Sequence, residues 1–108
     1  MTTKAKVDPG PCGFVTVIEA KKVAPQHVYV SITSDCESIK KLSSIGIIDA
    51  ANDLYGSYGK SKVYIKSAEC IKHVACPVPC AILKAVEVEA GLAVPKDVVI
   101  ELEHEEDE

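Results

Sequence analysis

The side chains in this 108-residue chain that are best suited to chemistry are its five cysteines, Cys12, Cys36, Cys70, Cys76 and Cys80. A thiolate is a nucleophile and a metal ligand, and it oxidises readily, so this density of thiols indicates sulfur chemistry. Three kinds of site use thiols in this way: a metal ion or cluster, a sulfur carrier, and a disulfide framework.

Three of the cysteines fall in one stretch, with the pattern C-x2-H-x2-C-x3-C formed by Cys70, His73, Cys76 and Cys80. Zinc sites use nitrogen and sulfur ligands at such short spacings. Iron–sulfur clusters use three or four cysteines, and a proline often follows the last, as Pro77 follows Cys76. The run is not C-x2-C-x2-C, so that match is partial. His73 also fits a plain loop residue and Cys80 a small core residue, and whether either takes part stays open.

The other two cysteines lie in segments that also suit a ligand. Cys12 is in the turn-rich loop Asp8-Pro-Gly-Pro-Cys-Gly13, where small neighbours allow the backbone close to a bound group. Cys36 falls in the first turn of a predicted helix that opens at Ser34, where the helix dipole favours a thiolate. Cys36 is equally compatible with an incidental small residue, and for Cys12 an incidental half-exposed thiol is the alternative.

Composition excludes several classes of protein. The formal net charge is −4 and all twelve basic residues are lysines, so a nucleic-acid partner is not expected without arginine to read bases and phosphates. No apolar run reaches the ~18 residues of a membrane span, and residues 1–7 do not form a signal peptide. We therefore expect a cytoplasmic protein with no membrane contact. No hydrolytic motif such as H-E-x-x-H occurs, and whether the chain is an enzyme stays open.

Alternating apolar residues predict two antiparallel strands, Phe14–Val23 and His27–Thr33, joined by a short turn. A capping box of Ser34 and Glu37 predicts a helix, interrupted at Gly46 and resumed over Ile47–Tyr55. Val63–Ile65 is a candidate third strand.

Pro77 and Pro79 predict the start of a helix that buries Ile82, Val86 and Leu92 and ends at Gly91. Asp97–Leu102 reads as a last strand with alternate apolar residues inward. The whole predicts one domain over 1–108, with residues 1–8 and 103–108 frayed. Its order is β-β-α-(β)-α-β, an α+β fold with a small, mostly antiparallel sheet and helices on one face.

Two resemblances accompany these patterns. Cys76-Pro77-Val78-Pro79, followed by a helix with Lys84, resembles the C-P-x-P signature of the TusA-like sulfur carriers. That likeness covers about a fifth of the chain and implies that Cys76 carries a persulfide. In that family, however, the signature lies near the N-terminus after one strand, and the other cysteines here are not part of it.

The whole chain more closely resembles a small uncharacterised family of anaerobic bacteria and archaea. The likeness lies in Cys12-Gly13-Phe14, Ser34-Asp35-Cys36-Glu37, His73-Val74-Ala75-Cys76-Pro77-Val78-Pro79 and Ala81-Ile82-Leu83-Lys84-Ala85. It implies that Cys12, Cys36, Cys70 and Cys76 are the important set, and an anaerobic host favours iron–sulfur or persulfide chemistry.

The leading hypothesis is a metal site of Cys12, Cys36, Cys70 and Cys76 at one end of the sheet, holding zinc or an iron–sulfur cluster. The alternative is a persulfide carrier or thiol redox protein in which Cys76 is the catalytic nucleophile. A proline-fixed helix start is then expected to lower the pKa of Cys76. A third reading is an interaction module with incidental cysteines. The sequence identifies neither a partner protein nor an oligomeric state.

Overall fold

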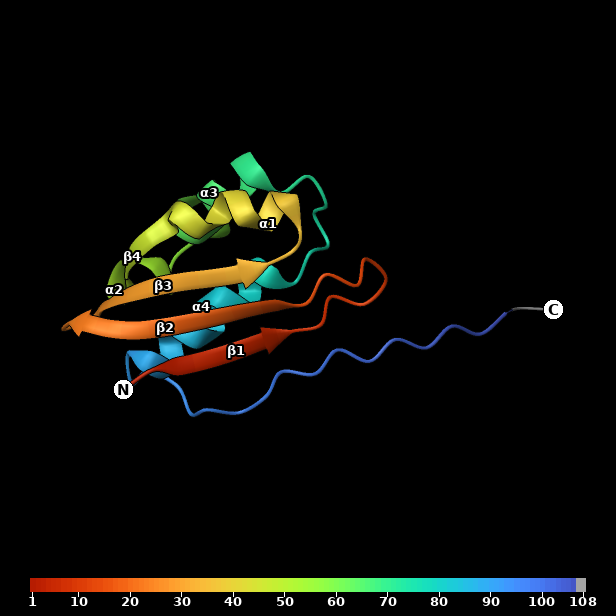
Figure 1. Ribbon diagram of the computed structural model, residues 1–108. Helices are drawn as coiled ribbons and strands as arrows, with labels where there is room; N and C mark the ends of the chain where they lie inside the picture. The colour runs from red at the N-terminus through yellow and green to blue at the C-terminus, as the bar shows by residue number, and fades with distance from the viewer. Residues whose placement is uncertain (107–108) are drawn as a thin grey trace.

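The computed structural model describes residues 1–106, and these form a four-stranded antiparallel sheet in the order β1-β2-β3-β4 (Figure 1). The strands are β1 (Thr3–Val7), β2 (Thr16–Ala24), β3 (His27–Ser34) and β4 (Gly46–Asp49). The helices are α1 (Glu37–Leu42), α2 (Ala50–Asp53), α3 (Lys62–Cys70) and α4 (Val78–Glu89), with single 3-10 turns η1 (Ser43–Ile45) and η2 (Tyr58–Lys60). The predicted α+β class is confirmed.

The central hairpin of β2 and β3 follows the predicted alternation. Ile18 pairs with Ile32 and Ala20 with Val30 across the two strands, and Ile18, Ala20 and Val30 are completely buried. Tyr29 points to the opposite, exposed face. Period-two alternation therefore predicted both strands of the hairpin correctly. Phe14, the first residue of the predicted strand, precedes β2 and is exposed.

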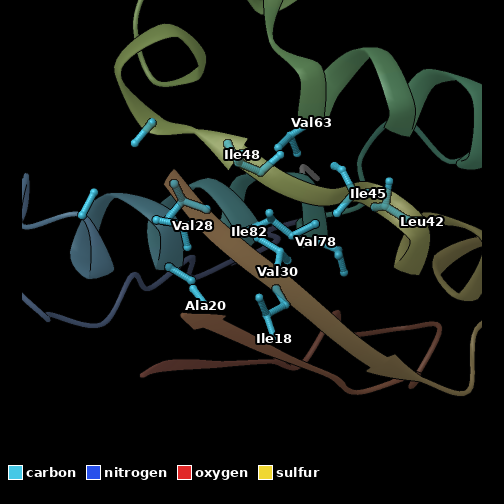
Figure 2. Packing of buried hydrophobic residues seen from close by; sticks show 14 of the residues in the cluster. Ile18, Ala20, Val28, Val30, Leu42, Ile45, Ile48, Val63, Val78 and Ile82 are labelled. Carbon is cyan, nitrogen blue, oxygen red and sulfur yellow. The ribbon is translucent and has the colours of Figure 1, made fainter. Parts of the chain in front are cut away.

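One hydrophobic cluster joins the sheet to the helices, which shows that α1, α3 and α4 cover the same face. Figure 2 shows the β2 and β3 side chains directed toward Val78 and Ile82 of α4. The cluster consists of Ile18, Ala20, Val28, Val30, Ile39, Leu42, Ile45, Ile48, Ala50, Val63, Val78, Ile82, Ala85, Val86 and Ala90.

Helix α4 lies against β1 and β2, with Ile82 and Val86 buried as predicted. It ends at Gly91, also as predicted: Gly91 has φ +79°, and the Leu92 N–H donates to the Glu87 carbonyl at 2.8 Å. This Schellman cap turns the chain away, so Leu92 is exposed rather than buried.

The structure differs from the sequence-based prediction in two places: at the N-terminal residues and at the start of α1. Residues 3–7, expected to be frayed, form β1 and pair with β2 from Thr3↔Ala20 to Val7↔Thr16. At α1, the Ser34 side chain accepts from the Cys36 N–H at 3.2 Å, and Glu37 pairs with Lys40. The reciprocal capping box is not formed, and the helix begins one residue after Cys36.

In the middle of the chain, part of a predicted helix is a strand, and a predicted strand is part of a helix. Ile47 and Ile48 belong to β4 instead of a helix, because they pair with Tyr29 and Val28 of β3. Residues 63–65, the candidate strand, lie inside α3, which is capped by the Ser61 side chain accepting from the Tyr64 N–H at 3.3 Å. Short apolar runs do not distinguish strand from helix, and tertiary pairing decided both.

The predicted last strand is absent from the described residues. Asp97–Leu102 forms neither helix nor strand, is exposed, and runs away from the body of the domain (Figure 1). This extension gives the chain dimensions of 56 × 28 × 25 Å. Of the tail expected to be frayed, residues 107–108 lie outside the described part. Over residues 1–106 we find no helix with the length and apolar character that crossing a membrane requires.

Candidate thiol site

Three separate segments of the chain converge at one end of the sheet. In an antiparallel sheet of this order, β1 and β3 finish where β2 begins, so the 8–15 loop and the 35–36 connection lie at the same end. The 71–77 loop, which leads into α4, reaches that end as well (Figure 1). Each segment carries one cysteine: Cys12, Cys36 and Cys76. We call this end of the sheet, with these three residues, the thiol end.

Cys76 sits in the turn just before α4. Its N–H donates to the His73 carbonyl at 3.0 Å, and its half-buried side chain packs against the hydrophobic core. Pro77 is the N-cap of α4, and the backbone N–H of Val78 faces the Cys76 sulfur. A helix start leaves such N–H groups without an intrahelical partner, so this one is available to the sulfur.

The ionisation of Cys76 is affected by its burial, by a backbone N–H and by two other cysteines. Burial raises the pKa of the Cys76 thiol, the Val78 N–H lowers it, and the charges of Cys12 and Cys36 raise it again, so that the pKa is raised overall. The charges of two cysteines from separate segments therefore both act on Cys76. The expected lowering of this pKa is wrong, because burial and two like charges outweigh one helix-terminal N–H.

Cys36 is positioned by the ends of two paired strands. It is the N-cap residue of α1, and its N–H donates to Ser34 Oγ. The hydroxyl of buried Thr16, opposite Ser34 in the sheet, donates to the same oxygen at 3.0 Å. The half-buried Cys36 side chain packs against the core, so this thiol has a fixed position.

Cys12 is exposed at the tip of a tight loop. The Gly13 N–H donates to the Gly10 carbonyl at 2.9 Å, and Asp8 Oδ1 accepts from the Gly10 N–H at 3.1 Å. Gly10 and Gly13 have φ of +83° and +73°, a region that other residues rarely adopt. The predicted loop that presents Cys12 is therefore present, and its glycines are what shape it.

The remaining two cysteines lie elsewhere. Cys70 is the half-buried last residue of α3, and within residues 1–106 its charge is not among those that shift the pKa of Cys76. Cys80 is exposed in the first turn of α4, not buried as a small core residue would be. Helix α4 contacts α3, and the charge of Cys80 adds to burial in raising the pKa of Tyr64.

The residues expected to bind a metal do not form a closed site. Over the described residues 1–106, no group of three or more His, Cys, Asp or Glu side chains could hold a metal ion. His73 is exposed in the 71–77 loop, and the ring of His27 hydrogen-bonds to the Pro25 carbonyl at 2.8 Å. The set of Cys12, Cys36, Cys70 and Cys76 therefore stays a prediction. Three of its members share the thiol end.

Comparison with known proteins places the chain in a family. The model of one family matches residues 3–102. The chain belongs to DUF6951, a family of unknown function. No curated protein and no solved structure matches it. The DUF6951 match spans all five cysteines and ends at Leu102. Membership confirms the expected uncharacterised family, and it assigns no activity to the thiol end.

Proposed function

We propose that this DUF6951 protein binds a soft metal ion or an iron–sulfur cluster through the thiolates of Cys12, Cys36 and Cys76, with Cys70 as the fourth ligand. The observation that supports this is the convergence of three separate segments, each carrying one cysteine, on the thiol end. Incidental cysteines have no reason to meet in this way.

Charge repulsion among the thiols supplies the physical reason for a cation. Ionising Cys76 is opposed by burial and by the charges of Cys12 and Cys36. A metal ion bound between the sulfurs removes this penalty, because it replaces the protons and neutralises the thiolates together. Tetrahedral thiolate coordination suits both zinc and iron–sulfur clusters.

Two ligands are fixed and two are carried by adaptable backbone. Cys36 and Cys76 pack against the core, whereas Cys12 is on an exposed loop and Cys70 ends a helix. Cys70 is joined to Cys76 by the 71–75 segment, which bounds their separation at about 20 Å even when fully extended. We expect metal binding to close the 8–15 loop and the end of α3 onto the fixed pair, since ligand sites commonly complete only when the metal binds.

Metal titration of cysteine variants tests the proposal. The protein, purified without oxygen, is titrated with Co²⁺ and the thiolate-to-metal absorption is followed; iron loading is followed by visible absorption. Cys12→Ser, Cys36→Ser and Cys76→Ser should each lower metal content. Cys80→Ser is the matched control, because this exposed cysteine lies one helical turn from Cys76 and faces α3, and it should bind as the parent does. Full occupancy in Cys12→Ser would reject the shared site.

A sulfur carrier is the second candidate, and one observation favours it. The Val78 N–H at the start of α4 faces the Cys76 sulfur, and prolines on both sides of Val78 fix that backbone. This arrangement stabilises a thiolate or persulfide, although burial works against it. After incubation with a persulfide donor, Cys76→Ser should lose the added sulfur atom in the mass spectrum and Cys12→Ser should keep it. Equal loss of bound metal in both variants supports the metal site instead.

A further inference from the structure

We propose that the C-terminal segment 97–102 of one copy of this chain pairs, as a fifth strand, with the β1 edge of a second copy. The result is a dimer in which two copies exchange their C-terminal arms. This inference does not depend on the thiol end, because no cysteine lies in β1 or in the arm.

The acceptor is the outer edge of β1. This strand pairs with β2 on one side, and over residues 1–106 no strand pairs with its other side. An edge strand presents a row of unpaired N–H and C=O groups that can accept another strand. The inward residues Ala5 and Val7 are only partly buried, so the hydrophobic layer is incomplete along this edge.

The donor is a strand-like segment that pairs with no strand among residues 1–106. Residues 97–102 read Asp-Val-Val-Ile-Glu-Leu, a composition typical of strands. Ile100 is 73% exposed and Leu102 91% exposed. The segment projects from the domain and accounts for its 56 Å length (Figure 1). Several large apolar side chains exposed together are unusual in a monomer and mark a docking surface.

The two elements match in pattern and in charge. In an extended arm, Val98, Ile100 and Leu102 share one face, and Asp97, Val99, Glu101 and Glu103 share the other. On β1, Ala5 and Val7 face the helices, and Lys4 and Lys6 face solvent. Pairing therefore sets apolar residues beside apolar residues and glutamates beside lysines.

A cross-strand ion pair already forms on the solvent-facing side of the sheet, where Lys4 and Lys6 lie. Lys4 Nζ lies 3.5 Å from Glu19 Oε1 of β2. Acidic residues on the far side of β1 would extend this row of alternating charge. Lysines also discourage a second β1 edge from pairing directly with the first, so the edge selects an acidic strand.

A second copy is the occupant that these features favour. Within its own chain, the arm leaves α4 through the Gly91 cap and passes β1 without pairing. A second copy supplies both an identical edge and an identical arm, so each dimer makes the contact twice under twofold symmetry. The DUF6951 match runs through Leu102, the last apolar residue of the arm, and so includes the whole segment.

The oligomeric state of the full chain tests the proposal. Light scattering coupled to gel filtration, in reducing buffer to exclude intermolecular disulfides, should give twice the 11.5 kDa chain mass. Ile100→Asp, on the face that meets the apolar layer, should weaken dimerisation by about tenfold or more. Val99→Asp is the matched control on the other face: its exposure is 71% and it introduces the same charge, yet the dimer should persist.

Charge exchange and hydrogen exchange complete the test. Lys6→Glu should weaken the dimer, and adding Glu101→Lys should restore it. The β1 amides should exchange slowly in the dimer and faster in Ile100→Asp. A parent protein that is monomeric at all concentrations overturns the proposal. In that case, protected β1 amides indicate that the arm docks within its own chain. Unprotected β1 amides indicate that the β1 edge is open. Equal loss of the dimer in Ile100→Asp and Val99→Asp also overturns it.

Discussion

The chemistry of Cys76 depends more on its surroundings than on its place at a helix start. Burial raises the pKa of its thiol, and the charges of Cys12 and Cys36 add to this. We expect Cys76 to alkylate more slowly than exposed Cys80 at neutral pH, since only the thiolate reacts. In Cys12→Ser one of the raising charges is gone, so the alkylation profile of Cys76 should move to lower pH. Peptide mapping by mass spectrometry across pH measures both. An unmoved profile would contradict the placement of Cys12 beside Cys76.

Ser67 is a second residue whose environment makes a clear prediction. Among the described residues, its Oγ is a buried side-chain oxygen without a hydrogen-bond partner. Ser67→Ala removes this unsatisfied group and improves helix propensity in α3, so the free energy of unfolding should rise by about 0.5–1 kcal/mol.

Ser61→Ala is the opposite case. The Ser61 side chain caps α3 and its hydroxyl donates to Asp53 Oδ2 at 3.1 Å, so its loss should lower the free energy of unfolding by about 0.5–2 kcal/mol. Urea denaturation of both variants measures these changes. A Ser67→Ala variant that is less stable than the parent would contradict the view that the Ser67 hydroxyl is unsatisfied.

At the scale of elements, Glu89 at the end of α4 ties the helix to two strands. Its carboxylate accepts from the Thr3 hydroxyl of β1 at 2.8 Å and from the Lys22 N–H of β2 at 2.9 Å. Burial raises the pKa of Glu89, but these two donors and the nearby positive charges outweigh it, so the pKa is lowered overall. The ionised form therefore stabilises the fold.

Glu89→Gln should lower the free energy of unfolding at neutral pH by about 1.5–3 kcal/mol, because it removes charge-assisted hydrogen bonds from a buried position. The folded pKa is lower than the unfolded one, so this contribution is present above the unfolded pKa and is lost as pH falls through the folded value. The difference in the free energy of unfolding between the parent and Glu89→Gln should therefore become smaller in acid. Glu87→Gln, which breaks the surface pair with Lys84 (3.1 Å), should cost at most about 1 kcal/mol. Urea denaturation at several pH values measures both, and a constant gap would count against the carboxylate's role.

The sequence predicts an element well when the signals for that element are local, and poorly when the element depends on its neighbours in the fold. The β2–β3 hairpin and α4 were predictable, because alternation, the prolines and Gly91 are local signals that the packing reinforces. β1 was not, because a strand of Thr, Lys and Ala residues shows its character only when paired with β2. β4 looked helical for the same reason. At the thiol end, the set of Cys12, Cys36, Cys70 and Cys76 rested on the family resemblance, whereas the direction of the Cys76 pKa depends on burial and neighbours that only the fold provides.

At the scale of the whole molecule, the thiol end brings together three segments that are far apart in the sequence. Cys12 belongs to the β1–β2 loop, Cys36 to the β3–α1 connection and Cys76 to the loop between α3 and α4. Under the proposed function, a metal bound to all three would cross-link the sheet to both helical segments, and only the folded chain would bring the three ligands together. By linkage, metal at ~100 times its dissociation constant should add about 2.7 kcal/mol to the free energy of unfolding.

Thermal unfolding with and without Zn²⁺ in reducing, oxygen-free buffer measures this gain. For a domain of about 100 residues, a gain of 1 kcal/mol corresponds to roughly 4–8 °C in Tm, so the increase should be easily detected. Cys80→Ser should show the full increase, and Cys36→Ser should show little, since it removes a ligand fixed by Ser34 at the start of α1. A Tm that rises equally in Cys36→Ser would mean that the metal binds elsewhere. An unchanged Tm in the parent would remove metal binding as the function of the thiol end and favour the persulfide carrier at Cys76.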